Sequence, residues 1–209
     1  MLDWRMSATA ADLLGGEVLD ELDYPLLLAS STLVLLWRNR AAAQLPQGAL
    51  PLHWRDGQLE ADAAMDHGPL VRAVVAAIRQ GRRSLLTLRA GEPAEADVAV
   101  VPLRSASTAD AALLICPKPH VCPDLTLDCY ARRRKLTSGE TRVLRGLCQG
   151  LTPDDIARDH GVAMSTVRTQ IGSLRAKTGT KDLRALTRKI ATLPPLVTAL
   201  GMAAWPLRA

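Results

Sequence analysis

The chain has 209 residues, enough for one large domain or two small ones. Hydrophobic residues make up 48% and charged residues 22% of it, which is typical of a folded protein and excludes a disordered one. Arg38 and Arg40 interrupt the longest apolar run before it reaches the roughly 18 to 20 residues of a membrane span. The N-terminal stretch MLDWRMSATAADLLGG has acidic residues early and no sustained apolar core, unlike a signal peptide. We therefore expect a cytoplasmic protein with no membrane partner.

The formal charge of +5 is distributed unevenly along the chain. Residues 1–130 contain 11 Lys and Arg against 16 Asp and Glu, net −5, whereas residues 131–209 contain 15 against 5, net +10. A basic segment is a candidate for binding a polyanion such as nucleic acid, although a solvated basic surface is the alternative.

The first part of the chain mixes strand-like and helix-like segments. Two apolar runs of strand length with a Ser-containing turn between them predict a hairpin, and Gly81 is a plausible helix stop. Predicted strands lie at 24–30, 32–39, 84–90, 97–104 and 110–117, predicted helices at 40–45 and 68–81, and a small hairpin at 50–61.

The stretch LDYPLLLASSTLVLLWRNRAAAQL at 22–45, together with the terminal three-strand meander, resembles a PAS domain. Asn39, followed by alanines, occupies the strand-to-helix junction of this resemblance, which covers about residues 15–118. The resemblance implies a five-stranded antiparallel sheet with helices packed on one face, in a domain that senses a signal or dimerises. No cofactor is expected, and a small-molecule ligand would be of unknown identity. Haem ligation by His53 or His67 is the weaker alternative.

Cysteines cluster after the last predicted strand, in ICPKPHVCPDLTLDC. The intervals of five and six residues separating Cys116, Cys122 and Cys129 match no common structural zinc spacing, even with His120 nearby. Free thiols are expected, and no metal. Residues 119–135 are interpreted as a linker that contains a short helix and ends in the basic run RRRK, which either contacts phosphates or is solvated.

Helix caps divide the basic segment that follows. Thr137 and Glu140 form a capping-box pattern, so a helix begins near Ser138. Thr152 caps a second, short helix with Pro153 at its first position. A third helix covers 164–178, and a fourth begins near residue 181.

The second and third helices have the spacing of a helix-turn-helix. Ala157 is small where the helices cross, Gly161 permits a left-handed turn, and Val167 fills the wedge between them. A plain helical bundle is the alternative.

The stretches LTSGETRVL, GLTPDDIARDHGV and STVRTQIGSLRAKTGT resemble the LuxR-type helix-turn-helix, a four-helix DNA-binding module, over residues 136–193. The resemblance implies a recognition helix at 164–177 and a dimerisation helix at 181–192. It places base contacts at Arg168, Thr169 and Gly172, and dimer contacts at Leu183, Leu186 and Ile190. Ala163 departs from the family, which has Ser at this position, so the cap of the recognition helix is either missing or shifted to Ser165.

The recognition helix has a polar face of small residues between cationic flanks. Such a face lets a helix enter a major groove about 12 Å wide, with Arg168 paired to guanine and the Thr169 methyl against a thymine methyl. Further contacts with DNA, mainly with phosphates, are predicted for Thr152, Ser165, Thr166, Gln170, Ser173, Arg175, Lys177 and Lys181.

These observations predict an α+β chain. Its expected parts are an N-terminal extension at 1–14, a PAS-like domain at 15–118, a linker at 119–135, a DNA-binding domain at 136–193 and a tail at 194–209. The predicted function is that of a homodimeric bacterial transcription regulator that binds double-stranded DNA at a two-fold operator, with RNA polymerase as a further candidate partner. The alternative is a module that binds a protein partner. No catalytic motif is recognisable, so no enzyme activity is expected.

Overall fold

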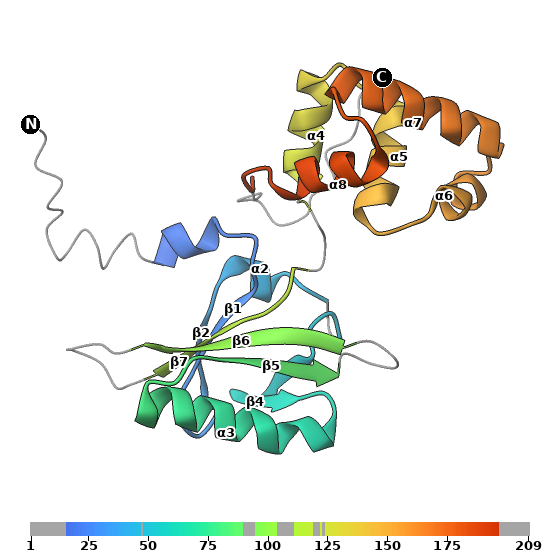
Figure 1. Cartoon of the computed structure of the whole chain (residues 1–209). Helices are drawn as coiled ribbons and strands as arrows, with labels where there is room; N and C mark the ends of the chain where they lie inside the picture. Colours follow the sequence, from blue (N-terminus) through green and yellow to red (C-terminus); the bar gives the residue numbers. More distant parts are fainter. Residues whose placement is uncertain are drawn as a thin grey trace, which may run out of the picture. The chain divides into compact units, whose positions relative to one another are not determined.

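The computed structural model describes residues 16–46, 48–89, 95–103, 111–118, 122 and 124–196. The chain divides into two compact units, Met1–Pro119 and His120–Ala209. Figure 1 labels their helices and strands. In the described ranges, no helix is both long enough and apolar enough to cross a membrane.

The N-terminal unit is built on a five-stranded sheet with the order β2-β1-β7-β6-β5, in which all neighbours are antiparallel. The strands of this sheet are β1 (Leu26–Ala29), β2 (Leu35–Arg38), β5 (Ser84–Arg89), β6 (Glu95–Leu103) and β7 (Ala111–Ile115). A separate pair, β3 (Leu52–Arg55) and β4 (Gln58–Ala61), forms the predicted small hairpin. The helices are residues 16–20, α2 (Arg40–Ala43) and α3 (Ala64–Gln80).

One face of the five-stranded sheet forms the core of this unit. Side chains alternate between the two faces of a strand, and Val98 and Val100 of β6 are fully buried, as is Leu114 of β7. They belong to one hydrophobic cluster with Leu70 and Val74 of α3. Helix α3 and the β3–β4 hairpin lie on this same side of the sheet (Figure 1).

Asn39 joins three segments at the junction of β2 and α2. Its side chain is fully buried, and its Oδ1 accepts hydrogen bonds from the amides of Leu26 (2.9 Å) and Ala42 (3.1 Å). Its Nδ2 donates to the carbonyls of Leu19 (3.1 Å) and Tyr24 (2.9 Å). The side chain therefore caps α2 and also holds the start of β1 and the preceding helical residues.

Helix α3 begins earlier than its sequence predicts. It starts at Ala64, four residues before the predicted residue 68, and contains Pro69 within it. Gly81 ends it as predicted, with a left-handed backbone at φ 67°. The ring of His53, the haem alternative, lies between Glu60 (3.2 Å) and Asp62 (2.8 Å) on the β3–β4 hairpin.

The C-terminal unit is all helical over its described residues. Its helices are α4 (Asp124–Arg133), α5 (Ser138–Cys148), α6 (Pro153–Asp159), α7 (Met164–Thr178) and α8 (Leu183–Ala191). They enclose a second hydrophobic cluster that includes Leu144, Ile156 and Leu174. A five-stranded antiparallel sheet with helices, followed by a helical region, confirms the predicted fold class.

The segment interpreted as a linker is structured over most of its length. Helix α4 occupies ten of its residues, and Leu127 and Tyr130 are buried in the core of the C-terminal unit. The hydroxyl of Thr126 donates to the carbonyl of Pro194 (3.3 Å) and accepts from the amide of Leu196 (2.7 Å). The chain after α8 therefore packs against α4 as far as residue 196, and the rest of the predicted tail lies outside the described residues.

Candidate nucleic-acid interface

Helices α6 and α7 are joined by a tight turn with the predicted geometry. Gly161 has a left-handed backbone at φ 62°, a conformation that costs glycine little. Val167 is fully buried, and Ala157 packs against the same core. The close packing of α5 on α6 also requires a glycine at Gly146, since a Cβ at this position would lie 2.9 Å from Ile156 Cγ1 of α6. This requirement was not predicted from the sequence. Helices α6 and α7 therefore form a helix-turn-helix, and α5 packs closely against α6 at Gly146.

The sides of α7 differ in exposure. Val167, Ile171, Leu174 and Thr178 are buried in the core of the unit. The exposed residues are Ser165, Thr166, Arg168, Thr169, Gly172, Arg175 and Ala176. A Cβ at Gly172 would meet no atom within 4 Å, so the fold of the free domain does not require glycine there.

Glu140 at the start of α5 holds the side of α7 that carries Ser173 and Lys177. Its Oε1 accepts from Ser173 Oγ (2.5 Å), and its Oε2 accepts from Lys177 Nζ (2.7 Å) and from the amide of Thr137 (2.6 Å). Burial by itself would raise the pKa of this carboxyl, but the hydrogen bonds and the charge of Lys177 lower it to about 2. The ionised carboxylate therefore serves both the predicted capping box of α5 and the attachment of α7.

Several side chains that the sequence assigned to DNA have partners within the C-terminal unit. Lys177 Nζ also donates to the carbonyl of Lys135 (3.1 Å), and Ser173 Oγ is held by Glu140. Gln170 lies against α5, since a Cβ at Gly139 would be 2.5 Å from its Nε2. The hydroxyl of Thr152 donates a hydrogen bond to the carboxylate of Asp155 in the capping box of α6 (2.6 Å), and this bond lowers the pKa of that carboxyl. The structure thus gives these four residues bonds or contacts within their own unit.

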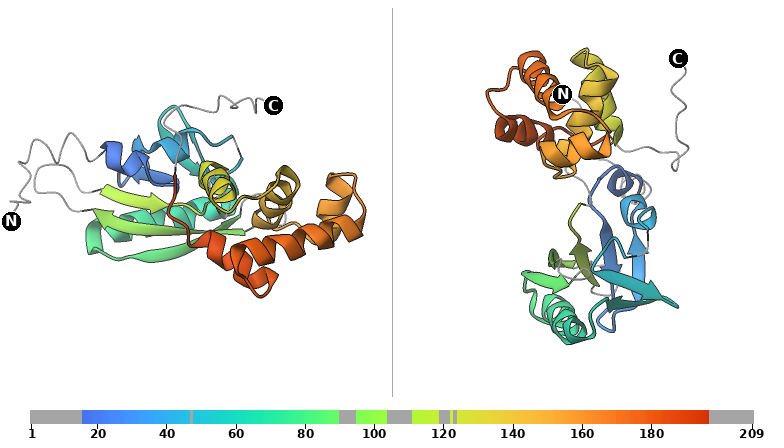
Figure 2. Two further views of the ribbon diagram at one scale, coloured as in Figure 1. Left: turned by 90° about the horizontal axis from the view of Figure 1, so that it is seen from above. Right: turned by 90° about the vertical axis from the view of Figure 1, so that its right-hand side faces the viewer.

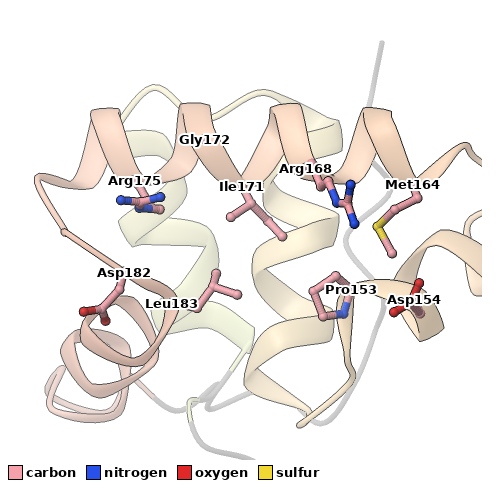
Figure 3. A pocket seen from close by; sticks show the side chains of 9 residues that line it. All are labelled: Pro153, Asp154, Met164, Arg168, Ile171, Gly172, Arg175, Asp182 and Leu183. Carbon is pink, nitrogen blue, oxygen red and sulfur yellow. The ribbon is translucent and has the colours of Figure 1, made fainter.

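A groove of about 440 Å³ runs along α7 beside α6 and α8. In Figure 3, Arg168 and Met164 extend from α7 toward Pro153 and Asp154 at the start of α6. Arg175 extends toward Asp182 at the start of α8, and its guanidinium donates to the carbonyl of Lys181. The groove is therefore bordered by two arginines and two carboxylates around an apolar floor that includes Ile171 and Leu183.

Helix α7 starts without a side-chain cap. Ala163 is its N-cap residue and makes no side-chain hydrogen bond. Ser165 does not replace it, because it lies inside the helix, where its carbonyl accepts from Thr169 Oγ (2.9 Å). Of the two alternatives posed by the sequence, the cap is missing rather than shifted.

The side chains of α8 that were predicted to contact a partner pack against the core of their own unit. Leu186 and Ile190 are 0% exposed and belong to the core of their own unit, so neither can contact a partner. Leu183 is half-buried and packs against the same core. The side of α8 that the resemblance assigned to a dimer interface is the side that packs within its own unit.

The cysteines near the unit boundary belong to different cores. Cys116 lies in the hydrophobic cluster of the N-terminal unit, and Cys122 and Cys148 lie in that of the C-terminal unit. His120 is outside the described residues. Burial raises the pKa of Cys116 and Cys148 to about 12. These two thiols are therefore protonated near neutral pH and are poor nucleophiles.

The geometry of α5, α6 and α7 defines the C-terminal unit as a helix-turn-helix domain. Residues 134–190 match the GerE family, described as bacterial regulatory proteins of the luxR family. The C-terminal unit is therefore similar to the domain of this family of regulatory proteins.

Comparison with solved structures finds full-length and partial similarities. The structure of VqmA bound to DPO is 17% identical over 90% of this chain and 91% of that chain, with a TM-score of 0.35. A Vibrio cholerae VqmA dimer in the absence of target DNA is 18% identical over 88% and 86%, again with a TM-score of 0.35. A sensory box sensor histidine kinase from Vibrio cholerae is 17% identical over 56% of this chain and 98% of that one, with a TM-score of 0.32. No curated protein matches the chain.

Proposed function

We propose that the protein regulates transcription as a homodimer that binds a two-fold operator through α7. The observation that carries the proposal is the exposed side of α7, where Thr169 and Gly172 lie beside Arg168 and Arg175, two exposed arginines on one flank of the helix. The small residues allow close approach to base edges, and a guanidinium fits guanine in the major groove. An exposed glycine inside a helix costs about 1 kcal/mol relative to alanine. Because the free domain has room for a larger residue at Gly172, a surface outside the domain accounts better for the glycine.

Phosphate contacts are best assigned to exposed side chains. Lys181, Ser165 and Thr166 are exposed, and Arg175 is also exposed although its guanidinium donates to the carbonyl of Lys181. Ser173 and Lys177 were predicted to contact DNA, and Gln170 and Thr152 as well. We instead propose that these four hold α7 and α6 in position. The base contacts remain Arg168, Thr169 and Gly172.

The PAS-like N-terminal unit is proposed to control the DNA-binding domain, with a signal or a partner as its input. RNA polymerase is the proposed further partner of the DNA-bound dimer. We propose no catalytic activity, because the matched family is one of regulators.

The first experiment is selection of genomic fragments by the purified full-length protein at near-physiological salt. We expect enrichment of a short two-fold-symmetric motif. Arg168→Ala should then cost about 1 to 3 kcal/mol of binding and relax specificity at one base pair, because it removes a bidentate base contact. Lys181→Ala, the matched control, should weaken binding to all sequences alike and flatten the salt dependence. Unchanged operator affinity in both variants would contradict the proposed docking.

A protein-binding role is the second candidate. The groove beside α7 favours it, because Asp154 and Asp182 would repel phosphates while Ile171 and Leu183 offer an apolar floor. Salt separates the two functions: DNA binding weakens steeply with added salt, and an apolar protein contact does not.

A further inference from the structure

The two flanks of α7 differ in the positive charge that they leave available to DNA. With 3.6 residues per turn, Arg168 and Arg175 lie on one flank, and Lys181 belongs to the same flank because its carbonyl accepts from Arg175. Lys177 lies on the other flank, where its Nζ donates to the buried carboxylate of Glu140 (2.7 Å). A helix in a major groove meets phosphates along both borders of the groove. A cation for the second border must therefore come from another element.

Lys135 lies beside this second flank. Its carbonyl accepts a hydrogen bond from Lys177 Nζ (3.1 Å), so the turn between α4 and α5 contacts the last turns of α7. The same arrangement is visible from the front and from above (Figure 1; Figure 2, left). The side chain of Lys135 is exposed, and within the described ranges it forms no ion pair. Arg145 of α5, by contrast, pairs with Asp124 (3.1 Å) and Asp128 (2.9 Å) of α4.

Lys135 has a backbone conformation that favours glycine. Its φ is 53°, and it ends α4 in a Schellman motif. In this motif its amide donates to the carbonyl of Arg132 (3.1 Å), and the amide of Leu136 donates to the carbonyl of Ala131 (2.9 Å). The corresponding left-handed position at the end of α7 is Gly179. A residue with a Cβ is strained there, so a lysine costs stability relative to glycine, and such an outlier points to a role of its side chain outside the fold.

The other residues of the basic run 132–135 have roles within their own unit. Arg132 Nη2 donates to Cys129 Sγ (3.3 Å), one turn back along α4. The guanidinium of Arg134 lies over the ring of Tyr130, 5.6 Å from its centroid. Arg132 and Arg133 occupy the last turn of α4, where positive charge is favourable beside the negative end of the helix. The end of α4 therefore does not require a further cation after the helix.

We infer that Lys135 binds a phosphate of the DNA backbone, along the border of the major groove that lies on the α5 side of α7. The inference rests on the proposed function, because it requires α7 to lie in the groove. It deepens that function by assigning one residue of the basic run to DNA and the other three to their own unit. A lysine that contacts a phosphate releases about one condensed counterion. Its contribution is therefore independent of base sequence and sensitive to salt.

The first test compares two variants of the full-length protein that each remove one positive charge from the run. Fluorescence anisotropy with the operator selected from genomic fragments gives the slope of log affinity against log salt concentration. Lys135→Ala should lower the magnitude of this slope by about one and weaken binding to all sequences alike. Arg132→Ala, the matched control, should keep the wild-type slope. An unchanged slope in Lys135→Ala would overturn the inference, and so would an equal fall in both variants.

The contact itself is tested on the DNA. Each phosphate that borders an operator half-site is replaced in turn by a neutral methylphosphonate. One replacement should weaken binding by the wild type and by Lys135→Arg but not by Lys135→Ala, which has no contact to lose there. If every replacement affected the wild type and Lys135→Ala equally, Lys135 would not touch a phosphate and the inference would fail.

Lys135→Gly distinguishes a DNA contact from a structural role. The substitution relieves the left-handed backbone and keeps the carbonyl that accepts from Lys177, so the urea midpoint of the C-terminal unit should rise. Operator affinity should fall as it does in Lys135→Ala. If this variant instead lost both stability and affinity, the side chain would have a structural role and the inference would be wrong.

The outcomes separate this inference from the proposed function. If the wild type selects an operator and binds it with a steep salt dependence that Lys135→Ala leaves unchanged, the proposed function stands and the inference fails. If the wild type binds no duplex DNA at any salt concentration, the proposed function fails, and the phosphate contact fails with it.

Discussion

Glu140 joins α7 to the start of α5. Its carboxylate is 4% exposed and links the start of α5 to Ser173 and Lys177 on α7. Breaking a buried ion pair by removing one partner leaves an uncompensated charge and is strongly destabilising. The sequence reveals Glu140 as a capping residue through its distance from Thr137. It does not reveal the bonds to α7, which join residues more than 30 positions apart.

The low pKa of Glu140 predicts acid sensitivity of the C-terminal unit. The folded value of about 2 lies below the ordinary value of 4.5. The contribution of the ionised form, on the order of 3 kcal/mol, is therefore present above about pH 5 and is lost as the pH falls toward 2. Glu140→Gln should be less stable at pH 7 and should lose less stability between pH 5 and pH 2. Urea unfolding at several pH values measures this, with exposed Asp159→Asn as the control. Parallel profiles for Glu140→Gln and the wild type would contradict the assignment.

At the scale of elements, the sequence predicted most helices and strands correctly because their signals are local. The capping boxes at Thr137 and Thr152 and the left-handed Gly81 and Gly161 are set by neighbouring residues. The start of α3 was misplaced because Gly68 and Pro69 suggest a helix start, whereas the helix extends back to Ala64 and Asp66 in its first turn accepts a hydrogen bond from the amide of Arg89 (2.8 Å).

Which surface an apolar stripe contacts is not a local property. The resemblance assigned Leu186 and Ile190 of α8 to a partner, and the residues of α4 were interpreted as part of a linker. Apolar side chains of both helices belong to the core of their own unit. Periodicity shows that one side of a helix is buried but not whether the same chain or another covers it. For the same reason, the cationic flanks of α7 gave no sign that Lys177 is paired with Glu140.

A larger side chain at Gly172 of α7 should raise the stability of the C-terminal unit and lower its affinity for the operator. Gly172 is exposed, and its Cβ position is empty, so Gly172→Leu should raise the stability of the free domain by about 1 kcal/mol. The same side chain would stand between the helix and the bases, so operator affinity should fall at least tenfold. Urea unfolding and fluorescence anisotropy with the selected operator measure the two effects. Ala191→Leu on α8 serves as the control, with affinity retained. An unchanged affinity of Gly172→Leu would show that α7 does not approach the bases at this position.

At the scale of the whole molecule, two separate hydrophobic clusters indicate two folding units. The cluster of the N-terminal unit includes Leu114, and that of the C-terminal unit includes Leu144, with no residue in common. Each of these leucines is fully buried. Each unit therefore has a core of its own that can persist when the other unit is perturbed.

Independent cores predict that damage stays within one unit. Leu144→Ala should cost about 2 to 5 kcal/mol through the cavity it leaves, and Leu114→Ala should cost a similar amount in the other unit. Hydrogen exchange followed by mass spectrometry should show that Leu144→Ala accelerates exchange in α5, α7 and α8 while β1, β6 and β7 keep their protection. Leu114→Ala should give the reverse pattern. If either substitution removed protection from both units together, the chain would unfold as one cooperative body. In that case, a signal bound by the N-terminal unit would alter DNA binding by changing the stability of the whole chain rather than by repositioning two intact domains.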